Sequence, residues 1–246
     1  NKAVWRDAFG SYIRYNSPVK LTFEILQGEF EYAIENLNFL ADEKADGKEL
    51  IDRLGQHLFS YYIWDVFPLT GDGSLLERFY DKTKEDRKRW GHLFDYIGRS
   101  LRNSGKHLDK KLINRTIAFF DWRLEAAELL ELQEFTFWLE AECLDSNWRL
   151  QSYSKILNLG RKKNGGLSFE VGVLNKLISD NLNLVVECFA KITDTMNQST
   201  QIYIPVNEAK SILRAGLTAV DSEIRENAER AQENLLQLGR FEYLDV

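Results

Sequence analysis

Apolar residues recur at helical spacing along most of this chain, and two stretches near its carboxyl end carry the same pattern. Seven apolar positions match at a fixed offset of 39 residues, with Val173, Leu174, Ile178, Val185, Phe189, Ile192 and Met196 matching Ile212, Leu213, Leu217, Ile224, Ala228, Ala231 and Leu235. A helical repeat of this length is typical of stacked helix pairs, in which each pair buries its apolar face only against its neighbours. Residues 168–240 are therefore expected to form the most regular part of the fold.

The rest of the chain predicts further helices with a less regular pattern. Two are expected within the first 40 residues, with Ser17 and Pro18 placed as the N-cap and first residue of the second. A helix from Lys48 should end before Pro68, and Ser74 should cap the next one. Later helices are expected at Trp90–Leu101, Leu112–Leu124, Leu132–Cys143 and Leu150–Leu157. The pattern thus predicts an all-α fold of roughly ten to twelve helices, irregular in the N-terminal half.

The composition is that of a folded chain with long helices and short joints. Of the 246 residues, 44% are hydrophobic and 28% are charged, which is the balance of a globular protein. The chain has 3 prolines and 15 glycines, so few positions force the backbone to turn or break a helix. No linker rich in serine, glycine or proline divides it, and residues 1–246 are expected to form a single domain.

Other sequence features bear on where the protein acts. The chain has neither a run of about 18 apolar residues nor a signal-peptide pattern, which predicts a cytoplasmic protein without membrane contact. Cys143 and Cys188 lie in apolar helical patterns, where we expect them to behave as small buried hydrophobic residues. The chain begins at Asn1 and contains one methionine, Met196, so we expect it to be a fragment of a larger protein.

A short motif lies at the joint between the last two predicted helices, where Asp221, Ile224, Arg225 and Ala228 stand as D-x-x-I-R-x-x-A. A short acidic side chain at such a joint accepts the free N–H groups of the second helix, while the isoleucine and alanine face inward one turn apart. The arginine is expected to reach back toward the aspartate. This joint resembles that of HEAT repeats, in which an aspartate and an arginine form a ladder between units.

The resemblance to HEAT repeats implies a right-handed α-α superhelix, that is, a HEAT-like solenoid. The preceding unit departs from the family pattern, because it carries Leu182 and Val186 where the ladder residues would stand. The ending Gly239 to Tyr243 also resembles the closing segment of helical-repeat tails on large bacterial multidomain proteins, some of which carry a nucleotide-binding module upstream. Stacks of this kind act as surfaces and spacers more often than as enzymes.

No catalytic, cofactor-binding or metal-binding residue is predicted. The glycine turns at residues 71–74 and 165–166 lack the lysine and the preceding strand of a phosphate-binding loop. The acidic turn that begins at Asp42 lacks the acidic third and twelfth positions of a calcium loop. Three histidines are isolated from one another along the chain: His57, His92 and His107.

Charge is distributed in blocks along the sequence. Residues 82–115 contain eleven Lys or Arg and four Asp or Glu, within a chain whose net charge is −6. Residues 24–52 carry nine acids against two bases, and residues 121–145 carry eight against one. Such blocks could steer a charged partner or dock against each other. The candidate residues for binding phosphate groups or an acidic protein surface are Arg99, Arg102, Lys106, Lys110, Lys111 and Arg115. Their alternative role is a solvated face with internal ion pairs.

The sequence therefore favours a non-catalytic helical-repeat scaffold or regulatory segment of a larger bacterial cytoplasmic protein. Its partner would be another protein or other domains of the same polypeptide, and no cofactor is expected. One alternative is a nucleic-acid-binding module that uses residues 82–115. A second alternative is an enzyme on an irregular helical fold with a site in residues 45–125, which a pocket of strongly perturbed titratable groups there would favour.

Overall fold

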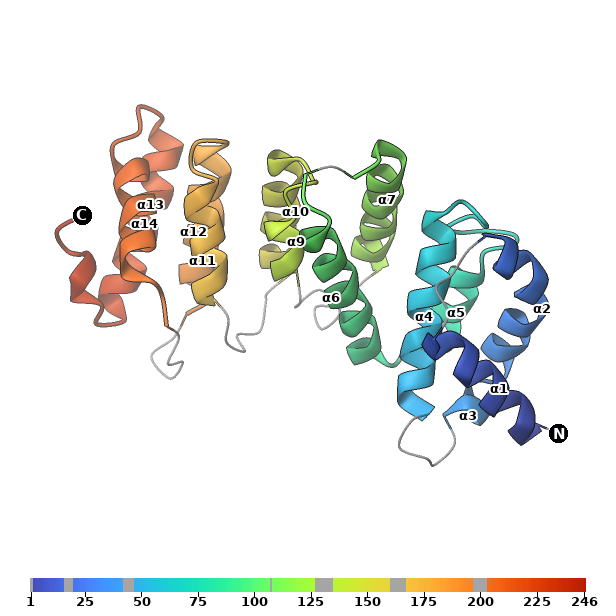
Figure 1. The fold of residues 1–246 in the computed structure, drawn as a ribbon. Helices are drawn as coiled ribbons and strands as arrows, with labels where there is room; N and C mark the ends of the chain where they lie inside the picture. Colours follow the sequence, from blue (N-terminus) through green and yellow to red (C-terminus); the bar gives the residue numbers. More distant parts are fainter. Residues whose placement is uncertain are drawn as a thin grey trace. The chain divides into compact units, whose positions relative to one another are not determined.

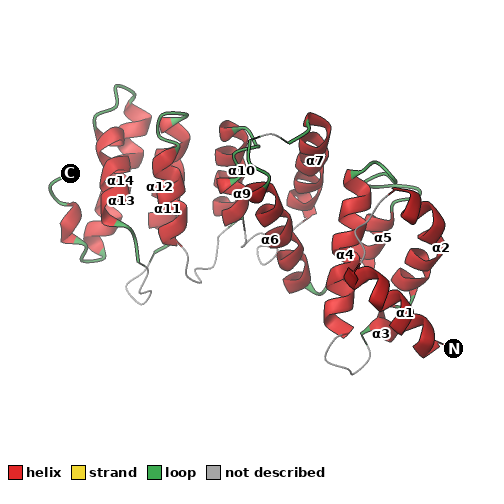
Figure 2. Cartoon of the chain, in the orientation of Figure 1, coloured by secondary structure: helices red, strands yellow, loops and turns green. Residues whose placement is uncertain are grey.

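The structure is a computed structural model that describes residues 2–15, 20–41, 47–106, 108–126, 135–159, 167–196 and 203–246 (Figure 1). Within these ranges every regular element is helical, with thirteen α-helices, one 3-10 helix and no strand (Figure 2). Contacts divide the chain into two compact units. Unit 1 comprises residues 1–96 and 108–131, and unit 2 comprises residues 97–107 and 132–246. The grouping of residues 1–246 into one domain stays a prediction.

Unit 1 is built around helix α4. Its helices are α1 (Lys2–Tyr15), α2 (Lys20–Glu35), α3 (Leu37–Leu40), α4 (Gly47–Ile63), α5 (Leu75–Thr83), the first part of α6 (Arg87–Asn103) and α7 (Lys110–Ala126). Helix α4 contacts α1, α3, α5 and α7. Its Tyr61 packs against Phe23 and Phe30 from α2, with ring centroids 4.8 and 5.4 Å apart. Aromatic pairs at such distances contribute beyond the area they bury, so α4 organises the core of this unit.

The turn between α4 and α5 is fixed by side chains at both of its ends. As predicted, Ser74 caps α5, because its Oγ accepts the Glu77 N–H at 3.1 Å. Asp65 has a φ of 66°, which is uncommon for a residue with a side chain. Its carboxylate accepts hydrogen bonds from Lys111 Nζ and Arg115 Nη1, each at 2.7 Å. The turn is therefore fastened to α7.

Arg123 and His57 are two of the titratable side chains that are buried in unit 1. Arg123 on α7 is fully buried, and its Cζ lies 3.8 Å from the ring centroid of Tyr80, 4.8 Å from Trp122 and 5.2 Å from Trp90. Cation–π attraction is strongest where the cation is removed from water, so this cage links α5, α6 and α7.

The second of these side chains is His57 on α4. Its Nε2 lies 2.7 Å from the carbonyl oxygen of Ile13, and its Nδ1 is buried without a partner. Burial lowers the pKa of His57 below its ordinary value. The neutral ring fits this environment, because a proton added at Nδ1 would be buried with no acceptor.

Unit 2 contains three successive pairs of helices. They are α9 (Thr136–Glu140) with α10 (Ser146–Asn158), α11 (Leu167–Lys176) with α12 (Leu182–Asp194), and α13 (Val206–Leu217) with α14 (Ser222–Gln237), followed by the 3-10 helix η1 (Phe241–Tyr243). Each pair contacts the next through equivalent helices, since α11 contacts both α9 and α13, and α12 contacts both α10 and α14 (Figure 1). The two copies of the apolar pattern coincide with the last two pairs.

The apolar pattern faces the interior of unit 2. The matching positions in the two copies that are both buried are Val173, Leu174, Phe189 and Ile192 with Ile212, Leu213, Ala228 and Ala231. At Gly216 the packing leaves no room for a side chain, because an ideal Cβ there would lie 2.7 Å from Ala228 Cβ and 3.1 Å from Val186 Cγ2. Helix α13 thus approaches both α14 and α12 through a bare backbone position.

The structure corrects two details of the predicted helices. The thirteen α-helices of the described residues exceed the predicted ten to twelve, because the four residues of α3 are too few to show a periodic pattern of their own. Cys143 lies in a turn rather than in a helix, since Ala141 ends α9 in an extended conformation and Asp145 caps α10 shortly afterwards. The predicted cap at Ser17 and Pro18 and the apolar position Leu132 lie outside the described residues.

The end of the chain folds back onto α14. Gly239 has a φ of 79°, and the Gln232 side chain donates from Nε2 to the carbonyl of Tyr243 at 2.7 Å. Tyr243 is buried, and its hydroxyl has no hydrogen-bond partner. Burial raises the pKa of Tyr243 to about 12. In the described part of the chain, no helix has both the length and the apolar character needed to cross a membrane.

Candidate functional site

The six predicted basic residues are divided between the two units. Arg99, Arg102 and Lys106 belong to unit 2, whereas Lys110, Lys111 and Arg115 belong to unit 1. In unit 1, Lys111 and Arg115 hold Asp65, and Arg115 also donates from Nε to the carbonyl of Tyr62 at 2.7 Å. Lys110 is exposed in the first turn of α7.

In unit 2, the other three basic residues contact the segment around α9. The Arg99 and Arg102 guanidinium carbons lie 4.3 and 5.0 Å from the centre of the Phe137 ring. Arg102 also pairs with Glu140 at 3.4 Å, and Lys106 pairs with Glu142 at 3.5 Å. Most of the predicted phosphate-binding side chains are therefore engaged within the chain.

The sequence blocks of opposite charge meet each other inside both units. In unit 1, Lys82 pairs with Glu35 at 2.8 Å and Arg89 pairs with Asp52 at 2.9 Å, which joins the basic block to the acidic block of residues 24–52. Hydrogen bonds from Lys82 and Arg78 lower the pKa of Glu35. In unit 2, the pairs of Arg102 and Lys106 join it to residues 121–145. The blocks of opposite charge in the sequence therefore form ion pairs with each other within each unit.

The predicted joint of the last helix pair has the expected cap but a different arginine contact. Asp221 accepts the Glu223 N–H at 2.8 Å and caps α14. Ala228 is buried and Ile224 is half-buried. Arg225 donates from Nη1 to the carbonyls of Ala219 and Val220, both at 2.6 Å. The arginine therefore closes the turn after α13, because those carbonyls lack partners within a helix.

Polar links between successive helix pairs involve residues that the sequence did not single out. Asn181, the N-cap of α12, donates from Nδ2 to the Asn147 side chain of α10 at 2.7 Å. In the preceding helix pair, the N-cap is therefore Asn181, one position before Leu182. A second link joins α12 to α14, where Asn234 donates to Asp194 at 2.7 Å.

A further polar network joins the middle of α10 to α12. Lys191 Nζ donates to Glu187 Oε1 at 2.5 Å and to Ser154 Oγ at 2.8 Å. Burial acts to raise the pKa of Glu187, but the hydrogen bonds from Lys191 and Ser154 outweigh it and lower the pKa. These three side chains connect α10 to α12, which belong to neighbouring helix pairs.

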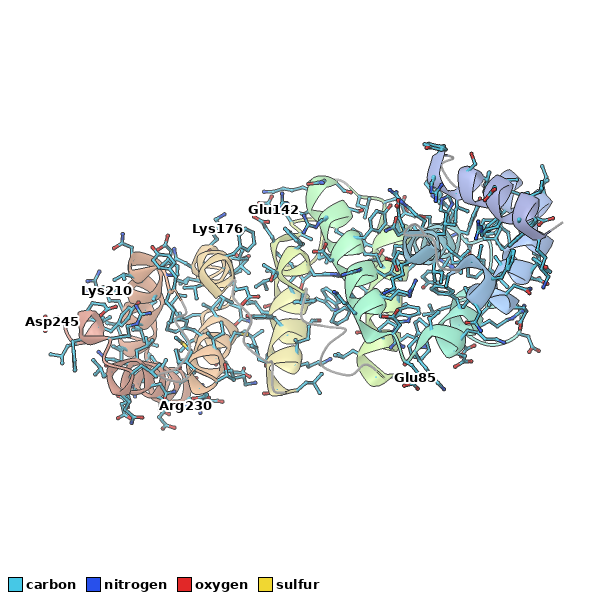
Figure 3. All side chains as sticks on the ribbon, turned by 90° about the horizontal axis from the view of Figure 1, so that it is seen from below. Glu85, Glu142, Lys176, Lys210, Arg230 and Asp245 are labelled. Carbon is cyan, nitrogen blue, oxygen red and sulfur yellow. The ribbon has the colours of Figure 1, made fainter. Side chains whose placement is uncertain are left out.

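One candidate site is a charged cavity within unit 2. Its volume is about 420 Å³, and it lies where the end of α6, the α9–α10 turn and the end of α11 meet. Its lining residues are Lys106, Glu140, Glu142, Leu144, Ser146, Arg149, Val173, Lys176, Leu177 and Asp180. Glu142 and Lys176 are labelled in Figure 3, which views the chain from below. The lining combines three cations, three carboxylates and an apolar surface.

Arg149 is the buried charge of this cavity. It is 6% exposed, and its Nη1 donates to the carbonyl of Leu139 at 2.8 Å, a group that the end of α9 leaves free. Nε is buried without a hydrogen-bond partner, and the Arg149 side chain lines the cavity. Burial lowers the pKa of Arg149, although Asp180 and Glu142 act to raise it.

Sequence reasoning missed Arg149 although a signal for it exists. Arg149 precedes Tyr153 and Ile156 by four and seven residues, so it occupies a position of the apolar stripe of α10. A charged residue on such a stripe must find partners in the interior or face a cavity. Among the described residues, no group of three or more His, Cys, Asp or Glu side chains could hold a metal ion.

Comparison with known proteins gives no relative on which to base a function. No protein-family model, curated protein or solved structure matches the chain. The function therefore has to be argued from the described residues and their contacts.

Proposed function

We infer that the chain is a non-catalytic helical-repeat module, HEAT-like in architecture, that binds a protein partner. The observation that carries this proposal is the order of contacts in unit 2, where α9, α11 and α13 follow one another and α10, α12 and α14 do the same. Helix pairs that bury their apolar faces mainly against neighbours build an extended surface. The mechanism of such a module is geometric, because its rigid helices present side chains at fixed spacing to a partner.

The polar links between pairs support the same proposal. Asn147 with Asn181, Ser154 with Lys191, and Asp194 with Asn234 each join one helix pair to the next. Contacts of this kind set the register between units, which a binding surface assembled from several units requires. The right-handed superhelix remains part of the proposal.

Selection from a random peptide library displayed on phage tests the interaction role. The folded full chain is immobilised, and binders to an unrelated helical protein are removed first. We expect convergent peptide sequences that the free chain displaces, because a specific surface selects a specific chemistry. Failure to enrich any convergent sequence would contradict the proposal.

The nucleic-acid alternative has a separate test. A titration with short nucleic acids at several salt concentrations should give no binding at low salt, since Arg102, Lys106, Lys111 and Arg115 already pair with acids or carbonyls of the chain. Tight binding with a steep salt dependence would instead favour this alternative.

The enzyme alternative receives less support from the region in which it was expected. Burial raises the pKa of Asp52, which lies 2.9 Å from Arg89 and 4.0 Å from His92. The cavity bounded by these three residues has a volume of about 10 Å³. Such a volume holds about one water molecule and leaves no room for a substrate.

A further inference from the structure

The cavity of unit 2 contains charged side chains that form no close ion pair with another described residue. Lys106 pairs with Glu142, and Glu140 pairs with Arg102. The other charged residues of the lining are Arg149, Lys176 and Asp180. Among the described residues none of these three forms an ion pair within 4.0 Å, and Asp180 accepts a hydrogen bond from the neighbouring Ser179 at 3.4 Å. Two cations and one carboxylate therefore line the cavity without a close ion pair, although Asp180 is near enough to Arg149 to act on its pKa.

Arg149 gives this arrangement its physical significance. A buried guanidinium lacks the hydration that stabilises it in water, and its cost is offset only where carboxylates or other acceptors satisfy its donors. The fold supplies one acceptor, the Leu139 carbonyl, to Nη1 and leaves the buried Nε without any. A planar guanidinium with donors left over is the group that best matches a carboxylate.

The other two residues define the charge of the ligand. Lys176, in the last turn of α11, is exposed and adds a second cation to the rim. Asp180 is exposed and follows α11 by one turn. A ligand that complements this set carries two negative groups and one positive group, and its backbone can lie on the apolar surface of Val173 and Leu177. The cavity volume of about 420 Å³ falls within the range of small-ligand pockets.

We propose that this cavity is a binding site for an acidic zwitterion, an amino acid or short peptide with two carboxylates and one ammonium group. Arg149 binds one carboxylate, Lys176 binds the other, and Asp180 accepts the ammonium group. The three carboxylates of the lining disfavour phosphate esters, since a group with two negative charges on one centre would face Glu140 and Glu142 as well.

Calorimetric titration of the full chain with three probes tests the site. L-glutamate carries all three charges, and glutarate lacks the ammonium group. Inorganic phosphate has neither two separate carboxylates nor an ammonium group. We expect glutamate to bind at low millimolar concentration or below, glutarate to bind about 2- to 5-fold more weakly, and phosphate to bind least. No binding of glutamate, or phosphate binding as tightly as glutamate, overturns the proposal.

Variants assign the roles of the three side chains. Arg149→Met should weaken glutamate binding by about 10- to 100-fold, because a hydrogen bond between charged groups is lost. Lys176→Ala, at an exposed position that does not threaten folding, should weaken it by about 2- to 5-fold. Asp180→Asn should abolish the preference for glutamate over glutarate. Lys155→Ala, exposed on α10 and outside the cavity, is the matched control and should bind as the wild type does.

These variants also decide the outcome if Arg149→Met fails to fold. Glutamate affinity unchanged by Lys176→Ala and a preference unchanged by Asp180→Asn would together overturn the site. The dipeptide alanyl-glutamate identifies the source of the ligand, since tighter binding than free glutamate indicates a peptide end and weaker binding indicates a free amino acid. If glutamate binds but no convergent peptides are selected, the partner-binding role is refuted and the glutamate site is supported. If convergent peptides are selected but glutamate does not bind, the glutamate site is refuted and the partner-binding role is supported.

Discussion

Replacing Gly216 with alanine probes the closest approach between helices of unit 2. The new Cβ would lie 2.7 Å from Ala228 Cβ, about 0.7 Å short of the closest ordinary contact of 3.4 Å. Ala228 has no rotatable side chain, so relief requires the backbones of α13 and α14 to separate. Overpacking of this kind costs about 1–3 kcal/mol, and the helix propensity gained from alanine returns about 0.5–1 kcal/mol. The expected net loss in the free energy of unfolding is about 1–2 kcal/mol.

A second glycine in an equivalent helix provides the control. Gly172 on α11 has no atom within 4 Å of an ideal Cβ. Gly172→Ala should therefore stabilise the protein by about 0.5–1 kcal/mol through helix propensity alone. Urea unfolding followed by far-ultraviolet circular dichroism measures both variants against the wild type. The two substitutions should move the transition midpoint in opposite directions.

The reciprocal substitution tests whether the contact with Ala228 is the cause. In Gly216→Ala combined with Ala228→Gly, the two methyl groups no longer meet, so the double variant should be more stable than the sum of the single effects by about 1 kcal/mol or more. A Gly216→Ala variant as stable as Gly172→Ala would refute the close packing of α13 on α14. Strict additivity in the double variant would assign the loss to Val186 instead.

Three further predictions concern buried polar groups. Tyr243→Phe should stabilise the protein by about 1 kcal/mol in urea unfolding, because the hydroxyl that it removes is buried without a partner. Arg123→Ala should destabilise it by about 3 kcal/mol through lost packing and cation–π contacts, measured by tryptophan fluorescence during unfolding, whereas Lys110→Ala should have little effect. Because burial lowers the pKa of His57, the unfolded chain binds more protons than the folded chain below pH 6.5, and stability should fall as the pH drops through that value. His57→Gln should reduce this dependence of stability on pH. A dependence that persists in His57→Gln would contradict the assignment.

Helical periodicity predicted most of the fold because the apolar stripes of α4, α6, α10 and the last four helices are long enough to show their period. The cap at Ser74 was predictable for the same local reason, since it depends only on its own helix. The short helix α3 escaped prediction because its four residues carry no period, whereas α9 was predicted but is shorter than the expected helix at Leu132–Cys143.

The candidate site was less predictable because its residues lie far apart along the chain. The cavity joins Lys106, the α9–α10 turn and the end of α11, and only Lys106 was among the residues predicted to bind a partner. Three buried charges, Arg123, Arg149 and Glu170, occupy apolar stripe positions, so a division into apolar and polar residues treats them as breaks in a pattern. Their burial depends on partners from other helices, which spacing within one helix does not reveal.

The order of contacts in unit 2 has a mechanical consequence. The last pair, α13–α14, is held mainly by α11 and α12. When the chain is pulled from its carboxyl end, we therefore expect the helix pairs to detach one after another, beginning with α13–α14. The hydrogen bond from Gln232 and the buried Tyr243 hold the final turn against α14. These contacts have to break before the pulling force reaches the last helix pair. In single-molecule stretching, unit 2 should lengthen in several small steps, and the first should be the loss of the Gln232 and Tyr243 contacts.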